Sequence, residues 1–385
     1  MSSLRRFPNE MLSEIFLRCV DAAATFDPVH NAGWALARVC QRWRSVALTT
    51  PDLWSHFVFP GPSDFRRPIP HRLWEIQLDR AHNSSLSIRF VAHVPADLLD
   101  MFFTVADRWK EVAFANNKVF ARFVDLAIEF PFLTKLVVED DSFGPLLPSG
   151  VPGTDLVKRL PTLRHLTLAL GSSNSFPPQL RFPWSQLRTC NLGNFRTSRI
   201  REVLPLLSPG THLTLRAPGA GDGSPTMIVT NIQSLEIMDG SRAARRDLLN
   251  VLVAPRLQKL LFTQSKVEGT DPDAITTFLN NSKCTLRHFR ILGCMWWQLI
   301  NILRLPAVGG VVHLEIGYLP MGEWGRLFVE LERVEPRLVP DLRTLVLRGN
   351  FSCWKISQRL SNRNPAGGFS RDLSILESGS SRRSN

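Results

Sequence analysis

The sequence contains no long hydrophobic run. No stretch approaches the roughly 18 apolar residues that a membrane span requires. The first residues, MSSLRRFPNEML, lack the uninterrupted apolar segment of a signal peptide. These absences argue against an integral membrane protein and against a secreted one. We therefore expect a soluble, intracellular protein that resides in the cytoplasm, the nucleus or both.

Cysteine is scarce, and its spacing is wrong for the usual zinc and redox sites. No two cysteines form a C-x-x-C pair, which argues against a zinc finger and a thioredoxin-like motif. They stand mostly among apolar neighbours, so we expect small buried thiols of a reducing compartment. The six are Cys19, Cys40, Cys190, Cys284, Cys294 and Cys353.

Familiar catalytic motifs are missing as well. The sequence has no G-x-S-x-G elbow and no H-E-x-x-H pair, and the glycine-rich stretch at 217–225 lacks the lysine of a phosphate-binding loop. Three adjacent carboxylates occur at 139–141, where a solvated loop explains them better than acid–base chemistry. We expect a protein that is not an enzyme and needs no cofactor or metal.

What is present is a basic chain of globular composition. It has 385 residues, 44% of them hydrophobic, and a formal net charge of +12. The length suggests two or more structural units or one elongated array. The charge could favour nucleic acid, an anionic membrane or an acidic protein partner. However, the basic residues are scattered without a block of five or six, which favours an ordinary solvated surface.

The N-terminal residues predict two helices with large apolar faces. Pro8 suits a first helical turn, and the residues after it repeat at helical spacing. A second helix is expected over about 33–48, ending before Pro51. The apolar positions are Met11, Leu12, Ile15, Phe16 and Cys19 in the first helix, and Leu36, Val39, Cys40, Trp43, Val46 and Ala47 in the second.

Such a small unit cannot bury all of this surface by itself. Phe7, Leu53 and Trp54 enlarge the apolar face further. Large exposed apolar faces usually mark interfaces, although later parts of the same chain could also cover this one. The two readings are about equally supported by the residues alone.

The stretches FPNEMLSEIF and ALARVCQRWRSVALTTPDLW together resemble an F-box. The resemblance implies a three-helix module over residues 1–58 that docks on a Skp-type adaptor and, through it, on cullin and RING subunits. Phe7 replaces the usual leucine, and the connection over 21–31 is longer than the common pattern, as in F-box-like proteins of fungi. The adaptor-binding positions that it implies are Pro8, Leu12, Ile15, Phe16, Val39, Cys40, Trp43, Leu53 and Trp54. In a packed site, replacing Ile15 or Trp43 by alanine should cost about 2–5 kcal/mol.

A proline-rich linker and a connecting helix are expected over 59–84, with Leu73, Ile76 and Ala81 on the apolar face of the helix. Beyond it, an L-x-x-L-x-L pattern recurs. It begins at 133, 163, 187, 210, 232, 257, 286, 311 and 342, with weaker copies near 86 and 109.

This spacing resembles leucine-rich repeats. It implies an irregular α/β solenoid over 85–350, with parallel strands on the concave face and helices or loops on the convex face. In that family Cys294 and Asn350 would bond a turn. Residues 351–385 are expected to form a cap or a flexible tail.

Alternation along each strand then predicts which side chains line the concave face. The candidates for target binding are His165, His212, Arg216, Lys259, His288, Arg290, His313 and Arg348. Four of them are histidines at one repeat position, which suggests a cationic, pH-sensitive strip for an acidic partner. The alternative is that a solvated strand position simply tolerates polar residues. A metal site is the least favoured reading.

Taken together, the residues predict a substrate-recognition subunit of an SCF-type ubiquitin ligase that binds an adaptor and a target protein. The alternatives are an interaction scaffold without a ubiquitin role and, less favoured, a basic nucleic-acid-binding repeat protein.

Overall fold

The computed structural model describes residues 7–22, 32–59, 70–91, 94–140, 155–170, 180–218, 226–263, 271–317, 319, 323–331 and 338–348. The chain divides into two compact units, 1–186 (unit 1) and 187–385 (unit 2), and each is described by itself. The predictions for Asn350, for Cys353 and for the cap or tail over 351–385 lie outside the described residues.

Unit 1 begins with three helices, which we call the head together with the 3₁₀ helix that follows them. They are α1 (Asn9–Ala22), α2 (Ala32–Leu36), α3 (Gln41–Leu48) and η2 (Pro51–Trp54). The single helix predicted over 33–48 is wrong, because the chain leaves the helical conformation before α3. Cys40 is extended, with φ −160° and ψ 171°, and its Sγ accepts a hydrogen bond from the backbone N–H of Trp43. It therefore caps a new helix, which helical periodicity alone does not reveal.

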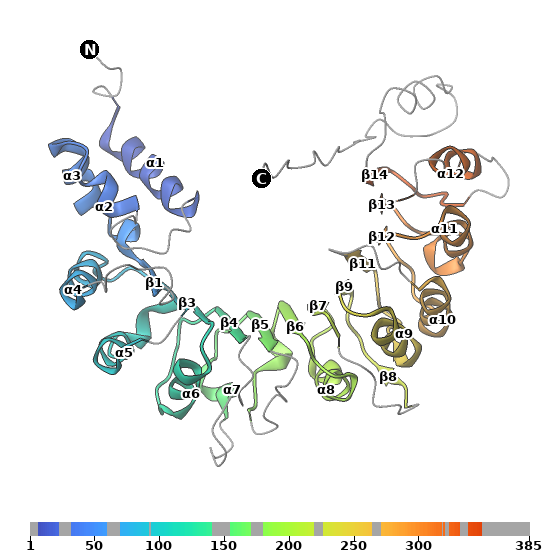
Figure 1. The fold of residues 1–385 in the computed structure, drawn as a ribbon, viewed down its shortest axis with the longest axis horizontal. Helices are drawn as coiled ribbons and strands as arrows, with labels where there is room; N and C mark the ends of the chain where they lie inside the picture. Colours follow the sequence, from blue (N-terminus) through green and yellow to red (C-terminus); the bar gives the residue numbers. More distant parts are fainter. Residues whose placement is uncertain are drawn as a thin grey trace. The chain divides into compact units, whose positions relative to one another are not determined.

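The rest of unit 1 is a parallel sheet whose strands follow chain order. The strands are β1 (His56–Phe59), β2 (Leu86–Phe90), β3 (Trp109–Phe114), β4 (Lys135–Asp140) and β5 (His165–Leu170). The helical segments are α4 (His71–Arg80), α5 (Ala96–Phe103), η3 (Ala106–Arg108), α6 (Asn117–Asp125), α7 (Leu156–Arg159) and η4 (Trp184–Gln186). Helices α4–α6 lie along one side of the strands (Figure 1).

The weak repeats near 86 and 109 are therefore strands of the array, as the sequence suggested. The array also begins earlier than expected, since β1 pairs with β2 ahead of residue 85. Its core is aromatic: Phe59, Phe90 and Phe114 stack on successive strands, with ring centroids 5.1 and 5.4 Å apart. In these strands phenylalanine occupies an inward position that the repeat motif assigns to leucine.

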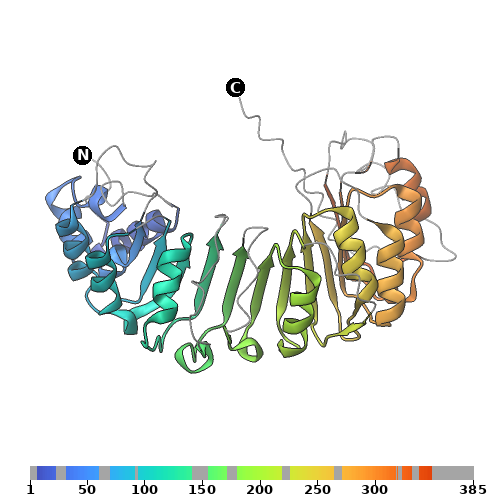
Figure 2. The same ribbon diagram turned by 60° about the horizontal axis from the view of Figure 1, so that its bottom comes forward.

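Unit 2 continues the same pattern, with strands on one side and helices on the other (Figure 2). Its main sheet has the parallel order β6 (Thr189–Gly193), β7 (His212–Arg216), β9 (Ser234–Met238), β11 (Lys259–Thr263), β12 (His288–Leu292), β13 (His313–Gly317) and β14 (Thr344–Arg348). A separate parallel pair joins β8 (Ile228–Val229) to β10 (Leu252–Val253). The helical segments are α8 (Thr197–Val203), η5 (Leu204–Leu206), α9 (Arg242–Val251), α10 (Pro272–Ser282), α11 (Trp296–Leu303), η6 (Pro306–Val308) and α12 (Trp324–Leu331).

Alternation and a repeated turn explain these strands. The second and fourth residues of a strand, such as Leu235 and Ile237 in β9, are buried against the helices. Several strands are directly followed by a residue of positive φ, among them Asn194 and Ala217. Their N–H groups donate to the last carbonyl of the next strand, at Arg216 and Met238 respectively. The predicted α/β fold, a helical head followed by a leucine-rich-repeat-like array, is confirmed.

Three cysteines are buried as expected. Burial raises the pKa of the Cys284 thiol to about 11 and that of Cys294 to about 12, with Glu323 adding to the second shift. The raised values fit the structural, unreactive role predicted for Cys294. Burial also raises the pKa of Cys190. The expectation of buried thiols is wrong for Cys19 and Cys40, which lie on exposed surface of the head.

Candidate functional site

The head closes a small core of its own. Leu12, Phe16, Leu53 and Trp54 are each 0–1% exposed. The indole N–H of Trp54 donates to the Ala47 carbonyl over 2.7 Å, so its polar atom is satisfied inside the core. These four of the predicted adaptor-binding residues therefore hold the head together and present almost no surface to a partner.

Four other predicted residues lie on the surface. Pro8 and Cys40 are exposed, Ile15 is 41% exposed and Val39 is 59% exposed. Met11, which was absent from the predicted set, is 50% exposed. Pro8, Met11 and Ile15 are spaced by three and four residues, so they form one strip along α1. The sequence contained this spacing, but it did not show which side of the helix faces inward.

Trp43 links the buried and exposed parts of the head. Its ring is half-buried and lies 5.0 Å from that of Phe16, at an interplanar angle of 57°. The two alanine substitutions considered above therefore differ. Ile15→Ala removes an exposed side chain, so a stability loss of 2–5 kcal/mol is no longer expected for it, whereas Trp43→Ala removes an aromatic contact of the core.

Arg42 joins the start of α3 to the start of α1. Its guanidinium donates to Asn9 Oδ1 at 3.1 and 3.2 Å and to the carbonyl of Phe7. Val39 and Cys40 lie directly before the helix that Arg42 ties to Phe7 and Asn9. We call Pro8, Met11, Ile15, Val39 and Cys40 the apolar strip.

A second set of contacts fixes the head to the sheet of unit 1. Gln77 of α4 is fully buried; its amide donates to the carbonyls of Trp54 and His56 and accepts from the indole of Trp34. Arg80 places its guanidinium 4.4 Å from the ring centroids of both Trp34 and Trp54. The connecting helix was predicted correctly, and Ala81 directly after it is buried as expected, but Leu73 and Ile76 are not its most buried residues.

The inward residues of α4 are Trp74 and Gln77, while Leu73 and Ile76 are half-buried. The pattern of hydrophobic residues cannot predict that a polar glutamine occupies the most buried position of the helix. It is buried because the chain offers it one donor and two carbonyl acceptors.

The strand face of unit 2, which points away from the helices, carries polar side chains in two rows. The first row consists of residues paired in register: Thr189, His212, Ser234, Lys259, His288, His313 and Thr344. The register confirms that the histidines at 212, 288 and 313 share one strand position. In unit 1, His165 is paired in register with Lys135. Arg216 is exposed at the end of β7.

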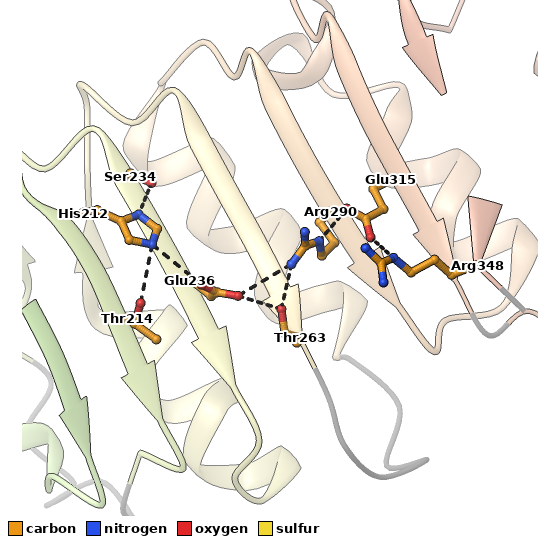
Figure 3. Close-up of polar contacts among 8 residues, drawn as sticks. All are labelled: His212, Thr214, Ser234, Glu236, Thr263, Arg290, Glu315 and Arg348. Carbon is orange, nitrogen blue, oxygen red and sulfur yellow. Dashed lines mark hydrogen bonds and ion pairs between the residues drawn. The ribbon is translucent and has the colours of Figure 1, made fainter. Parts of the chain in front are cut away.

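A continuous polar network crosses the same face (Figure 3). It is centred on Glu236, Arg290 and Glu315, which stand at the third position of their strands, the second row. Arg290 donates to Glu315 Oε2 over 2.6 Å and lies 3.6 Å from Glu236 Oε1. Arg348 contacts the other oxygen of Glu315, a side chain only 4% exposed. At the far end, His212 lies 3.7 Å from Glu236 Oε2.

Arg290, Arg348 and His212 were predicted to meet a target, and the structure gives all three partners within the chain. The sequence did not reveal that Glu236 and Glu315, at the same strand position with two strands between them, pair with these three side chains. A hydrogen bond from His212 is the main reason that the pKa of Glu236 lies below its ordinary value, and Thr263 and Arg290 lower it further. Target binding by this set remains a prediction.

Two structural absences apply to the described part of the chain. There, no group of three or more histidine, cysteine, aspartate or glutamate side chains could hold a metal ion. No helix within the same ranges is long and apolar enough to cross a membrane.

Comparisons with known proteins give remote structural likenesses. No family model matches the chain, and no curated protein matches it in sequence. Among solved structures, a protein from Bacteroides fragilis is 13% identical with a TM-score of 0.39; the match covers 78% of this chain and 76% of that one. Rad7, solved in complex with Elc1 in yeast, is 11% identical with a TM-score of 0.32, over 96% and 92% of the two chains.

Proposed function

We propose that this chain is a substrate-recognition subunit of an SCF-type ubiquitin ligase. The head would bind a Skp-type adaptor, and the strand face would bind a target protein. The chain itself would make or break no bond. Its contribution is proximity, since holding a target near a charged ubiquitin-conjugating enzyme raises the effective concentration of the reacting groups. Such a protein acts in the cytoplasm or the nucleus.

The observation that carries the proposal is the apolar strip. Met11, Ile15 and Val39 are between 41% and 59% exposed, although the core directly beneath them is sealed by Leu12 and Phe16. The head therefore does not need these side chains for its own folding. A surface of this kind on a module that resembles an F-box fits the docking of an adaptor.

Capture of the full chain by a purified Skp-type adaptor tests the proposal. Ile15→Glu should weaken capture at least about tenfold, because it places a charge in an apolar contact, and it should leave the melting temperature nearly unchanged. Val329→Glu is the matched control, since Val329 is 51% exposed on α12 of unit 2. Equal capture of wild type and Ile15→Glu, or no capture of either, would contradict the proposal.

An interaction scaffold without a ubiquitin role remains the second reading. A scaffold would also bind the adaptor through the apolar strip, but ubiquitin would not be transferred to the protein that it captures. Reconstituted ubiquitin transfer onto a protein that the chain captures separates the two. A scaffold gives capture without modification, whereas a receptor gives both.

A further inference from the structure

The first row of unit 2 contains three adjacent basic side chains, none of which pairs with a carboxylate among the described residues. Lys259, His288 and His313 are paired in register on β11, β12 and β13. The imidazole rings of His288 and His313 lie 5.5 Å apart, edge to face. All three side chains are exposed or half-buried. Across the described ranges, no carboxylate lies within ion-pairing distance of any of them.

The acids nearest to this site are already occupied. On β11, β12 and β13 the second row carries Leu261, Arg290 and Glu315, and on the flanking strands β9 and β14 it carries Glu236 and Val346. Glu236 is held by His212, Thr263 and Arg290, and Glu315 by Arg290 and Arg348. The flanking first-row residues, Ser234 and Thr344, are uncharged. Two arginines thus offset two carboxylates. Lys259 remains as a local positive charge, and protonation of either histidine would add to it.

We propose that Lys259, His288 and His313 form a binding site for carboxylate side chains of an acidic segment of a partner protein. The inference deepens the proposed function and rests on it, because it specifies what the strand face recognises in a target. Adjacent strands place the three side chains about 4.8 Å apart. In an extended segment, acidic residues separated by one position lie about 7 Å apart, which fits within the width of the site.

Proton uptake is expected to accompany binding. His288 is disfavoured as a cation by partial burial, by His313 and by Lys259, all of which lower its pKa. A bound carboxylate reverses that balance and favours the imidazolium. Affinity therefore rises as pH falls from about 8 to about 6, across the ordinary range of histidine.

A protein segment fits this surface better than a nucleic acid. A phosphate backbone needs a run of cations, whereas here a basic row is bordered by Glu236 and Glu315. Single-stranded nucleic acid also needs aromatic side chains for stacking. Neither row supplies one besides histidine among the described strands of unit 2.

Calorimetric titration of the full chain with a ten-residue oligoglutamate peptide tests the proposal. Wild type should bind at least about tenfold more tightly at pH 6 than at pH 8. Lys259→Gln combined with His288→Gln should lose at least about tenfold in affinity at pH 6. Lys118→Gln combined with His82→Gln removes the same two residue types from exposed positions in unit 1 and should bind as wild type does.

Several outcomes would overturn the inference. They are undetectable binding, binding that is equal in both double variants, affinity that does not depend on pH, and full displacement by inorganic phosphate or by a single-stranded oligonucleotide at equal charge. Melting curves show whether the double variants fold. The adaptor-capture experiment with Ile15→Glu reads the head alone, so a failed adaptor interaction with retained peptide binding rejects the proposed function and leaves this site standing.

Discussion

Arg290 donates to Glu315 within the polar network on the strand face of unit 2, with Nε and Oε2 2.6 Å apart. Glu315 is almost fully buried, and Arg348 binds its second oxygen. The carboxylate is therefore acceptable in a buried position because two guanidinium groups compensate for its lost hydration.

Glu315→Gln should destabilise unit 2, because it leaves two arginines beside a neutral amide. The expected loss is about 1–3 kcal/mol, below the cost of breaking a fully buried pair because both arginines are partly exposed. Urea unfolding gives the value. Glu139→Gln removes a carboxylate that lies 3.7 Å from Arg89 on exposed surface of unit 1, and it should cost less than about 0.5 kcal/mol. Equal losses in both variants would contradict the prediction.

Glu236 should make stability depend on pH in the acid range. Its pKa is lowered in the folded state, first by the hydrogen bond from His212. Its stabilising effect is therefore complete above the ordinary value of about 4.5 and is lost as pH falls through the lowered folded pKa. The difference in unfolding free energy between wild type and Glu236→Gln should be largest near pH 6 and should shrink steadily toward pH 2. A difference that stays constant would show that the carboxylate charge contributes nothing.

Gly317 should tolerate no side chain at the end of β13. A Cβ there would lie 2.7 Å from Leu292 Cδ2 and 3.1 Å from Arg348 Cβ. Gly317→Ala should cost about 1–3 kcal/mol through overpacking. Gly325 in α12 has nothing within 4 Å of such a Cβ, so Gly325→Ala should stabilise the helix by up to about 1 kcal/mol. The melting temperature should fall for Gly317→Ala and rise for Gly325→Ala. Shifts of the same sign in both variants would contradict the prediction.

Gln77 should contribute strongly to the stability of unit 1 although its side chain is polar. Gln77→Ala leaves the carbonyls of Trp54 and His56 and the indole of Trp34 without their partner, and we expect a loss of about 1–3 kcal/mol in chemical unfolding. Glu75→Ala, two residues away on the same helix, removes only exposed pairs with His71 and Arg72 and should cost less than about 0.5 kcal/mol. Similar values for the two variants would count against the hydrogen-bonding role.

Much of the array was predictable because its signal is repeated. Each L-x-x-L-x-L copy predicted a strand, and alternation placed outward residues such as His288 and His313 in one row. β1 was not recognised as part of the array because it reads HFVF, a strand built on phenylalanine without the leucine motif. The break before α3 was missed because Cys40 fits the helical spacing that it interrupts.

The sites were less predictable because pairing is a property of three dimensions. Sequence spacing identified Arg290 and Arg348 as outward residues, but not that one carboxylate would hold both. In the head, spacing found the apolar residues and could not separate Phe16, which is sealed inside, from Ile15, which is exposed. That division depends on which neighbours α2 and α3 supply.

The contacts of Gln77 and Arg80 also set how a partner on α1 would be held. Trp34 and Trp54 belong to the head, whereas Gln77 and Arg80 belong to α4, and His56 opens β1. If the chain were cleaved between 60 and 69, these side-chain contacts would still hold α4 against the head. A protein bound to the apolar strip would therefore have a fixed orientation relative to β1.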